Sequence, residues 1–168
     1  MTTTIAVTGH TDLTEESVPL VRAALDALLG RYARDGGGDL VGVSCLAAGA
    51  DSLFAEAVLA AGGRLVAVIP SRDYRRTKVE PARAPLFDRL VESAAEVLVL
   101  PRDRADRDAY DAANAVLVER ADRLVAVWNG EPPSGRGGGT ADAVRDAWAA
   151  GVPVEVVWPE GAGRGSRN

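Results

Sequence analysis

Residue types that build many catalytic and metal sites are scarce in this sequence. Its 168 residues include one cysteine, Cys45, one histidine, His10, and one lysine. A single cysteine excludes an internal disulfide and a cysteine-ligated metal cluster, and a single histidine excludes most histidine-based metal sites and catalytic triads. We therefore expect no bound metal and no cofactor.

Familiar catalytic motifs are also absent. The sequence has no G-x-S-x-G nucleophile turn, no P-loop ending in GK[ST] and no H-x-x-E-H zinc motif. No G-x-G-x-x-G fingerprint follows the first apolar run, which argues against a dinucleotide-dependent dehydrogenase. The sequence therefore contains no motif of these kinds that would assign a reaction to the chain.

Neither the charge nor the apolar runs indicate a nucleic-acid or membrane partner. The net charge is −5 and the pI is about 4.9, whereas a general nucleic-acid binder needs a basic face. No apolar run approaches the roughly 18 residues of a membrane span, and no basic-then-apolar signal opens the sequence. We expect a cytoplasmic protein with no membrane attachment and no general nucleic-acid binding.

Short apolar runs alternate with segments of helical periodicity along the chain. This order, with continuously apolar strands, is typical of a parallel sheet covered on both faces. We predict an α/β fold with a single doubly wound, mainly parallel, Rossmann-like sheet and helices on both faces. The domain spans residues 1–160, and the glycine-, serine- and arginine-rich residues 161–168 are predicted to be a disordered tail. The predicted strands are residues 4–8, 39–45, 65–69, 97–100, 123–128 and 154–158.

Local signals place the ends of several helices. Thr14 has the character of an N-cap, with acidic residues in the turn that follows, and Asp51 is the expected N-cap of the second helix. The pair Gly62-Gly63 is expected to end that helix. Prolines restrict helix formation between residues 70 and 85, so we expect that segment to be irregular.

Glycines, hydroxyls and cations follow the predicted strands at the point where each strand ends. Ligands of open parallel sheets bind outside the carboxyl ends of the strands, near the switch in strand order. Since four strand ends contribute such residues, we favour one shared site over the ordinary occurrence of glycines and hydroxyls in turns. The candidate ligand-binding residues are Thr8, Gly9, His10, Ser44, Gly49, Arg72, Arg75, Asn129, Gly137, Gly138, Gly139 and Thr140.

The stretch from Gly130 to Thr140, GEPPSGRGGGT, is the main local sign of such a site. It lies between a predicted strand and a predicted helix, where glycine N–H groups can approach an anion and the helix N-terminus favours negative charge. We interpret it as a phosphate-binding loop. A flexible surface connection accounts for the glycines equally well.

Several candidates have a structural explanation beside the functional one. His10 is either an acid–base or ligand-contacting residue or a turn residue that caps the first helix. Asp51 either contacts a ribose hydroxyl or only caps a helix, and Arg72 and Arg75 either close over a phosphate or are solvated. Cys45 is most simply a small core residue.

Two segments, in this order, carry a family resemblance. Residues 43–70, VSCLAAGADSLFAEAVLAAGGRLVAVIP, are similar to the pattern S-G-x-A-x-G-x-D…A-L-x-x-G-G-x-T-I-A-V in the Rossmann domain of the DNA-processing protein A family. Residues 114–154 resemble its later half and also the Lonely Guy proteins, formerly described as lysine decarboxylases. These families belong to the SLOG superfamily of Rossmann-like binders of nucleotides or their derivatives. The likeness extends from Ile5 to Trp158.

The resemblance implies roles for the matched residues. Residues 137–140 would form the phosphate loop, and the loops at Thr8-Gly9 and at residues 44–51 would line the pocket. The phosphoribohydrolase branch carries P-G-G-x-G-T-x-x-E, and in this sequence Ala143 stands at the glutamate. The carboxylates that remain for N-glycoside hydrolysis are Asp142 and Asp51.

The residues leave more than one function open. Our preferred hypothesis is a sensor or binding module for a nucleotide or nucleotide-derived phosphorylated ligand. The alternatives are a nucleoside-monophosphate phosphoribohydrolase and a scaffold without a ligand. The expected partner is a small phosphorylated ligand, and the resemblance also implies a homodimer.

Overall fold

The computed structural model describes residues 2–35, 39–133 and 139–165 and confirms the predicted α/β fold. Within these ranges, no helix has the length and apolar character needed to cross a membrane. The elements are β1 (Thr3–Gly9), α1 (Ser17–Asp35), β2 (Leu40–Ser44), α2 (Ala50–Ala60), β3 (Arg64–Ile69), α3 (Tyr74–Lys78), the 3₁₀ helix η1 (Pro81–Arg83), α4 (Ala84–Ser93), β4 (Glu96–Val99), α5 (Arg107–Arg120), β5 (Arg123–Val127), α6 (Thr140–Ala149) and β6 (Val154–Val156).

The six strands form one sheet in the order β4-β3-β2-β1-β5-β6, and every neighbouring pair is parallel. The chain builds outward from β1 to β4 and then crosses back, so that β5 pairs with the other side of β1. The strand order therefore reverses between β1 and β5. We call this position the switch point, and open α/β sheets bind their ligands there.

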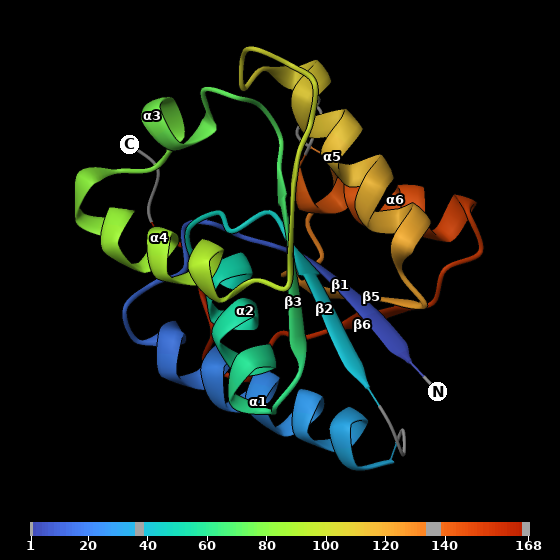
Figure 1. Ribbon diagram of the computed structural model, residues 1–168. Helices are drawn as coiled ribbons and strands as arrows, with labels where there is room; N and C mark the ends of the chain where they lie inside the picture. Colours follow the sequence, from blue (N-terminus) through green and yellow to red (C-terminus); the bar gives the residue numbers. More distant parts are fainter. Residues whose placement is uncertain (1, 36–38, 134–138, 166–168) are drawn as a thin grey trace.

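Helices cover both faces of the sheet (Figure 1). Helices α1, α2 and α4 lie on one face, and α5 and α6 lie on the other. Because successive strand residues point to opposite faces, Ile5 packs with Phe54 of α2 in one core, whereas Ala6 packs with Leu117 of α5 in the other. Apolar cores on both faces of the sheet thus explain why the sequence of each inner strand is continuously apolar.

Helix α2 lies very close to the sheet because glycines stand beneath it. A Cβ at Gly42 of β2 would lie 2.4 Å from Val58 Cγ2, and a Cβ at Gly9 of β1 would lie 2.4 Å from Ala50 Cβ. Larger residues at these positions would push the helix away. The close approach brings the N-terminus of α2 against the end of β1.

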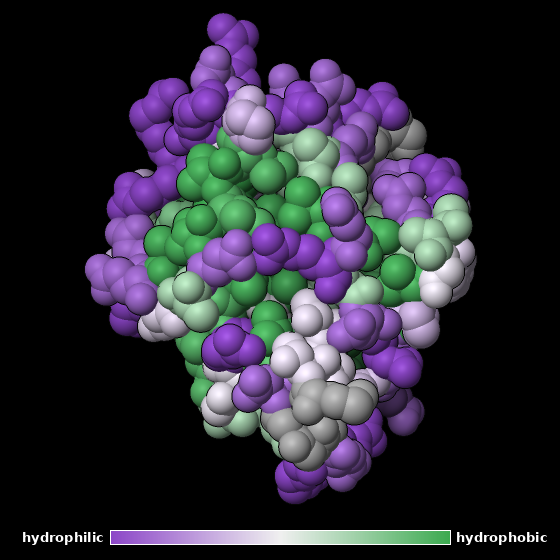
Figure 2. Space-filling view, turned by 45° about the vertical axis from the view of Figure 1, so that its right-hand side comes forward, coloured by the Kyte–Doolittle hydropathy of each residue, from purple (hydrophilic) through white to green (hydrophobic). Residues whose placement is uncertain are grey.

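The face that carries α5 and α6 is only partly covered. These helices pack over β1, β3 and β5, and Val41, Leu98 and Leu100 contact the core with part of their surface. Figure 2, in which this side is turned forward, shows a broad hydrophobic surface crossed by hydrophilic side chains. The sheet is therefore less buried here than the continuously apolar strands predict.

Two helices begin at other residues than predicted. Helix α1 starts at Ser17, and the Thr14 carbonyl accepts hydrogen bonds from the backbone N–H groups of Ser17 and Val18, so a turn precedes the helix. Gly49, and not Asp51, is the N-cap of α2. The reason is that Asp51 turns its carboxylate back toward the preceding loop instead of toward the helix end.

The segment from residue 70 to 85 is more regular than predicted. It contains α3 and η1, and α4 begins at Ala84 with Pro85 in its first turn. Proline is tolerated there because the N–H groups of a first turn have no partner within the helix. The prolines therefore set the start of α4 instead of delaying it.

Residues 161–165 also differ from the disordered tail that the composition predicts. Leu13 and Arg164 form an antiparallel bridge, Thr14 N donates to Gly163 O at 3.1 Å, and Gly163 N donates to Ser17 Oγ at 2.7 Å. These backbone contacts order a glycine-rich segment that has little preference of its own. Residues 166–168 lie outside the described residues.

Candidate functional site

The carboxyl ends of β1 and β5 meet at the switch point. Gly9 pairs with Val127, and His10 N donates to Val127 O at 3.1 Å. The side chain of His10 reaches Asn129, which lies 119 residues later in the sequence. Two of the predicted ligand-binding residues are thus in direct contact.

Asn129 is held in one orientation by Glu131. The Asn129 Nδ2 donates to Glu131 Oε1 at 2.7 Å, and Oδ1 accepts from Glu131 N at 3.0 Å. The His10 Nε2 lies 3.1 Å from Asn129 Oδ1 and 3.1 Å from Asn129 N. A protonated Nε2 donates to Oδ1, and an unprotonated Nε2 accepts from the backbone N–H. His10 therefore has a partner in either neutral tautomer.

The surroundings of His10 favour its neutral form. The residue is 6% exposed and packs edge-on against Trp158, with 5.5 Å between ring centroids. Burial lowers the pKa of His10 below its usual 6.5, and the Arg164 cation lowers it further, while hydrogen bonding and nearby carboxylates act in the opposite direction. His10 contributes hydrogen bonding to this site rather than a positive charge at pH 7.

Arg164 joins the two sides of the switch point. Its Nε donates to Asp12 Oδ1 at 2.8 Å, and its Nη1 donates to Glu131 Oε2 at 3.2 Å. Asp12 follows β1 and Glu131 follows β5, so one guanidinium bonds to both loops. Among the described residues, the carboxylates of Asp12 and Glu131 and the guanidinium of Arg164 therefore lie around the His10–Asn129 contact. Within the described residues, no three His, Cys, Asp or Glu side chains are grouped so as to hold a metal ion.

Sequence reasoning did not include Asp12, Glu131 and Arg164 among the site residues. The two acidic residues follow strand ends, and this position could have marked them as site residues. Carboxylates repel anions, however, so they do not by themselves indicate an anion-binding site. Arg164 lies in a glycine-rich segment after the last strand, and no sequence pattern brings that segment back to β1. Only the folded chain reveals this part of the site.

The predicted glycines Gly9 and Gly49 lie at this edge, and close contacts within the protein are enough to explain why glycine stands at both positions. Gly49 has φ 72°, and a Cβ there would lie 2.6 Å from the His10 carbonyl oxygen. Ala50 N donates to the same carbonyl at 3.2 Å. Direct contact of these glycines with a ligand stays a prediction.

The predicted hydroxyl residues at the ends of β1 and β2 are almost inaccessible. Thr8 is 7% exposed and Ser44 is fully buried. The Ser44 Oγ donates to Asp51 O at 3.0 Å and accepts from Leu46 N at 3.1 Å. Ser44 thus has a structural role in the turn after β2, and its contact with a ligand stays a prediction.

Arg72 and Arg75 are paired with carboxylates near β3 and β4. The Arg72 Nη1 donates to Asp103 Oδ1 at 2.7 Å, and Arg75 makes two bonds to Asp88, at 2.8 and 2.7 Å. These arginines follow β3, which β2 separates from β1. The structure gives them partners other than a ligand, and their closure over the site stays a prediction.

The predicted phosphate loop is described only at its end. Gly137 and Gly138 lie outside the described residues, whereas Gly139 is the N-cap of α6 and Thr140 is its first residue. The Asp142 carboxylate accepts from Gly139 N at 3.3 Å and pairs with Arg145 at 2.8 Å. A carboxylate of the chain itself therefore occupies the start of α6, where negative charge is favourable.

Asp51, the other candidate carboxylate, is buried in the first turn of α2. Its Oδ2 accepts from Ala47 N at 3.3 Å. Burial raises the pKa of Asp51 to about 7, and the Ala47 N–H and the Arg83 cation oppose this rise. Arg83 donates to the carbonyl oxygen of Leu46, at 3.2 Å, and Leu46 has a φ of 57°. Asp51 and Arg83 thus hold a strained turn after β2.

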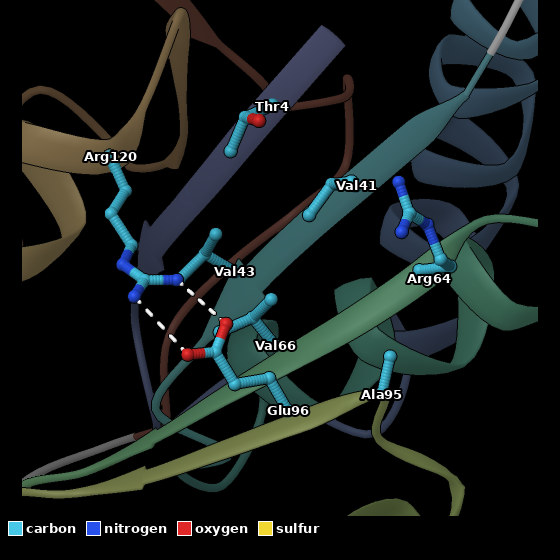
Figure 3. A pocket seen from close by; sticks show the side chains of 8 residues that line it. All are labelled: Thr4, Val41, Val43, Arg64, Val66, Ala95, Glu96 and Arg120. Atoms are coloured by element: carbon cyan, nitrogen blue, oxygen red, sulfur yellow. Dashed lines mark hydrogen bonds and ion pairs between the residues drawn. The ribbon is translucent and has the colours of Figure 1, made fainter. Parts of the chain in front are cut away.

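A cavity of about 350 Å³ lies away from the switch point, among the first halves of the strands (Figure 3). Glu96 and Arg120 close one side of it with two hydrogen bonds, of 2.9 and 3.2 Å. Since parallel sheets bind ligands at the opposite edge, we do not assign a ligand to this cavity. Its lining residues are Thr4, Val41, Val43, Arg64, Val66, Ala95, Glu96 and Arg120.

The fold is similar to that of several solved structures. DNA processing protein A from Streptococcus pneumoniae matches with a TM-score of 0.66 and 19% identity over 94% of this chain and 51% of that chain. The Helicobacter pylori protein of the same name, described with a single-stranded DNA binding mode, matches with a TM-score of 0.65 and 16% identity over 96% and 68%. The molybdenum cofactor carrier protein of Chlamydomonas reinhardtii matches with a TM-score of 0.54 and 20% identity over 93% and 76%.

These similarities confirm the predicted Rossmann-like fold, which this chain shares with DNA processing protein A and the molybdenum cofactor carrier protein. No family model and no curated protein matches the sequence. The chain spans about half the length of the S. pneumoniae protein, 51%. At such low identities the comparisons establish the fold and leave the ligand open.

Proposed function

We propose that this chain, which has the SLOG type of fold, binds a nucleotide or a nucleotide-derived phosphorylated ligand at the switch point. The ligand lies against the loops after β1 and β5 and is bound without being chemically changed. One observation carries this proposal: His10 of one loop contacts Asn129 of the other at 3.1 Å, at the edge where open parallel sheets bind ligands.

The nature of the similar proteins supports a phosphorylated ligand. By their names, one carries the molybdenum cofactor and another binds single-stranded DNA, and both ligands contain phosphate. The net charge of −5 favours a small ligand over a nucleic-acid strand. A mononucleotide satisfies both conditions.

The single histidine makes the proposal testable at the site itself. We expect AMP or another nucleoside monophosphate to raise the melting temperature, because a ligand at 100 times its Kd adds about 2.7 kcal/mol to the free energy of unfolding. The same ligand should shift the imidazole signals of His10 in a proton NMR titration.

Two outcomes would contradict this expectation. If no monophosphate raises the melting temperature, the scaffold hypothesis becomes the better one. If a nucleotide stabilises the protein while the His10 signals stay in place, the ligand binds elsewhere on the chain. Nucleosides without phosphate serve as the matched control and should stabilise the protein less.

N-glycoside hydrolysis is the second candidate function, and one observation favours it. The pKa of Asp51, raised to about 7, suits a general acid or base at neutral pH. Asp51 is nevertheless only 8% exposed, and its carboxylate accepts a hydrogen bond from Ala47 N, while the Asp142 carboxylate caps α6. We therefore expect no free adenine when the protein is incubated with AMP and the mixture is separated by chromatography. Release of adenine that Asp51→Asn abolishes would establish hydrolysis instead.

A further inference from the structure

The segment after β6 delivers Arg164 to the switch point through its backbone. Thr14 N donates to Gly163 O at 3.1 Å, Gly163 N donates to Ser17 Oγ at 2.7 Å, and Leu13 bridges Arg164. None of these contacts uses the guanidinium. These backbone bonds remain possible when the side chain of Arg164 is changed, so a substitution there removes the charge and leaves the backbone contacts of the segment in place.

The charges at the switch point require a cation before an anion can bind. Asp12 and Glu131 place two carboxylates beside the His10–Asn129 contact, and these charges repel a phosphate. The imidazole of His10 is neutral at pH 7 because burial lowers its pKa. Arg164 is the cation that bonds to both carboxylates.

The guanidinium of Arg164 keeps hydrogen-bonding capacity for a ligand. Its Nε donates to Asp12 and its Nη1 donates to Glu131. Among the described residues, none accepts a hydrogen bond from Nη2. A planar guanidinium presents five N–H donors, so it can bond to two carboxylates and a phosphate oxygen at once.

We propose that Arg164 binds the phosphate of the ligand at the switch point, and that the segment of residues 161–165 therefore completes the binding site. This proposal rests on the proposed function. It assigns the phosphate to a side chain that follows the last strand, in place of Arg72 or Arg75. The start of α6, which Asp142 occupies, is not needed to bind the phosphate.

Isothermal titration calorimetry of matched arginine variants tests the assignment. R164Q and R120Q each remove one positive charge that is bonded to carboxylates, but Arg120 pairs with Glu96 at the opposite edge of the sheet. We expect R164Q to bind AMP at least about tenfold more weakly than the unchanged protein, because a charge-assisted bond is lost. R120Q should bind AMP normally, and adenosine should bind all three proteins alike. GMP, CMP and UMP with their nucleosides are run in parallel.

The outcomes separate this proposal from the proposed function. If the unchanged protein binds none of the monophosphates, the proposed function fails and this assignment fails with it. If the unchanged protein binds a monophosphate and R164Q binds it equally well or more tightly, the site stands and the role of Arg164 is wrong.

A second variant and a second measurement guard against a folding defect. R164K keeps the positive charge but loses the planar guanidinium and its several N–H donors. We therefore expect its AMP affinity to fall between those of R164Q and the unchanged protein. The pKa of His10, followed by NMR without ligand, should rise in R164Q because the nearby cation lowers it. If the pKa does not rise in a folded R164Q, the guanidinium does not face His10 in solution and the assignment is overturned.

Discussion

Asp51→Asn is expected to stabilise the folded protein at pH 8 by up to about 4 kcal/mol and to flatten its stability profile between pH 4 and 7. Burial raises the pKa of Asp51 from 3.8 to about 7, so between these values the folded chain keeps a proton that the unfolded chain releases. The free energy of unfolding therefore falls as the pH rises through this window and stays low above it. Asparagine removes the charge and still offers an oxygen to Ala47 N.

Urea denaturation from pH 4 to 8 measures this effect. Asp26→Asn removes one carboxylate from an exposed position of α1, and this matched control should change the free energy of unfolding at pH 8 very little. At pH 4 the Asp51→Asn protein should be about as stable as the unchanged protein, since the buried carboxyl is then protonated. If the Asp51→Asn protein is less stable than the unchanged protein at pH 8, the attraction between the Asp51 carboxylate and Arg83 outweighs the cost of burying that carboxylate.

Gly49→Ala is expected to destabilise the protein by about 3 kcal/mol, combining backbone strain with overpacking. Gly49 has φ 72° and ψ −122°, a conformation that only glycine adopts readily. A Cβ would also lie 2.6 Å from the His10 carbonyl oxygen and 3.1 Å from Thr11 Cα, and both are backbone atoms. Urea denaturation gives the loss, and the NMR signals of His10 should move because its loop is displaced.

Gly62→Ala separates the two causes. Gly62 has a φ of 80°, but a Cβ there would meet no atom within 4 Å, so only the backbone cost of about 1 kcal/mol remains. The difference between the two variants measures the contact of α2 with the loop after β1. Equal losses would show that this contact relaxes without cost and that Gly49 does not fix the position of His10.

Much of the fold follows from local patterns that tertiary contacts do not override. The runs around Ile5, Val43 and Val125 are apolar on both faces, which predicts buried parallel strands, and the structure has these strands. Gly62 ends α2 with a positive φ, as its position after the periodic residues predicts. The start of α2 was predicted less well, because Asp51 forms a bond within the preceding loop that no sequence rule anticipates.

The position of the candidate site could be predicted from the sequence, but the residues that form it could be predicted only in part. The rule for strand ends indicates that His10 and Asn129 meet, because parallel strands end at one edge. The structure also shows a carboxylate, Asp142, at the start of α6 and a cation, Arg164, between the two loops. These two features depend on which side chains are nearest after folding, and their spacing in the sequence carries no sign of it.

The sequence by itself determined the class of fold, the order of its elements and the edge of the sheet at which polar residues collect, because periodicity and turn residues act over a few positions. Only the tertiary structure decided that the strand order reverses between β1 and β5, and that Arg164 lies between Asp12 and Glu131. The physical reason is that the pairing of β5 with β1, and the bonding of residues 161–165 to the start of α1, join parts of the chain that lie more than one hundred residues apart.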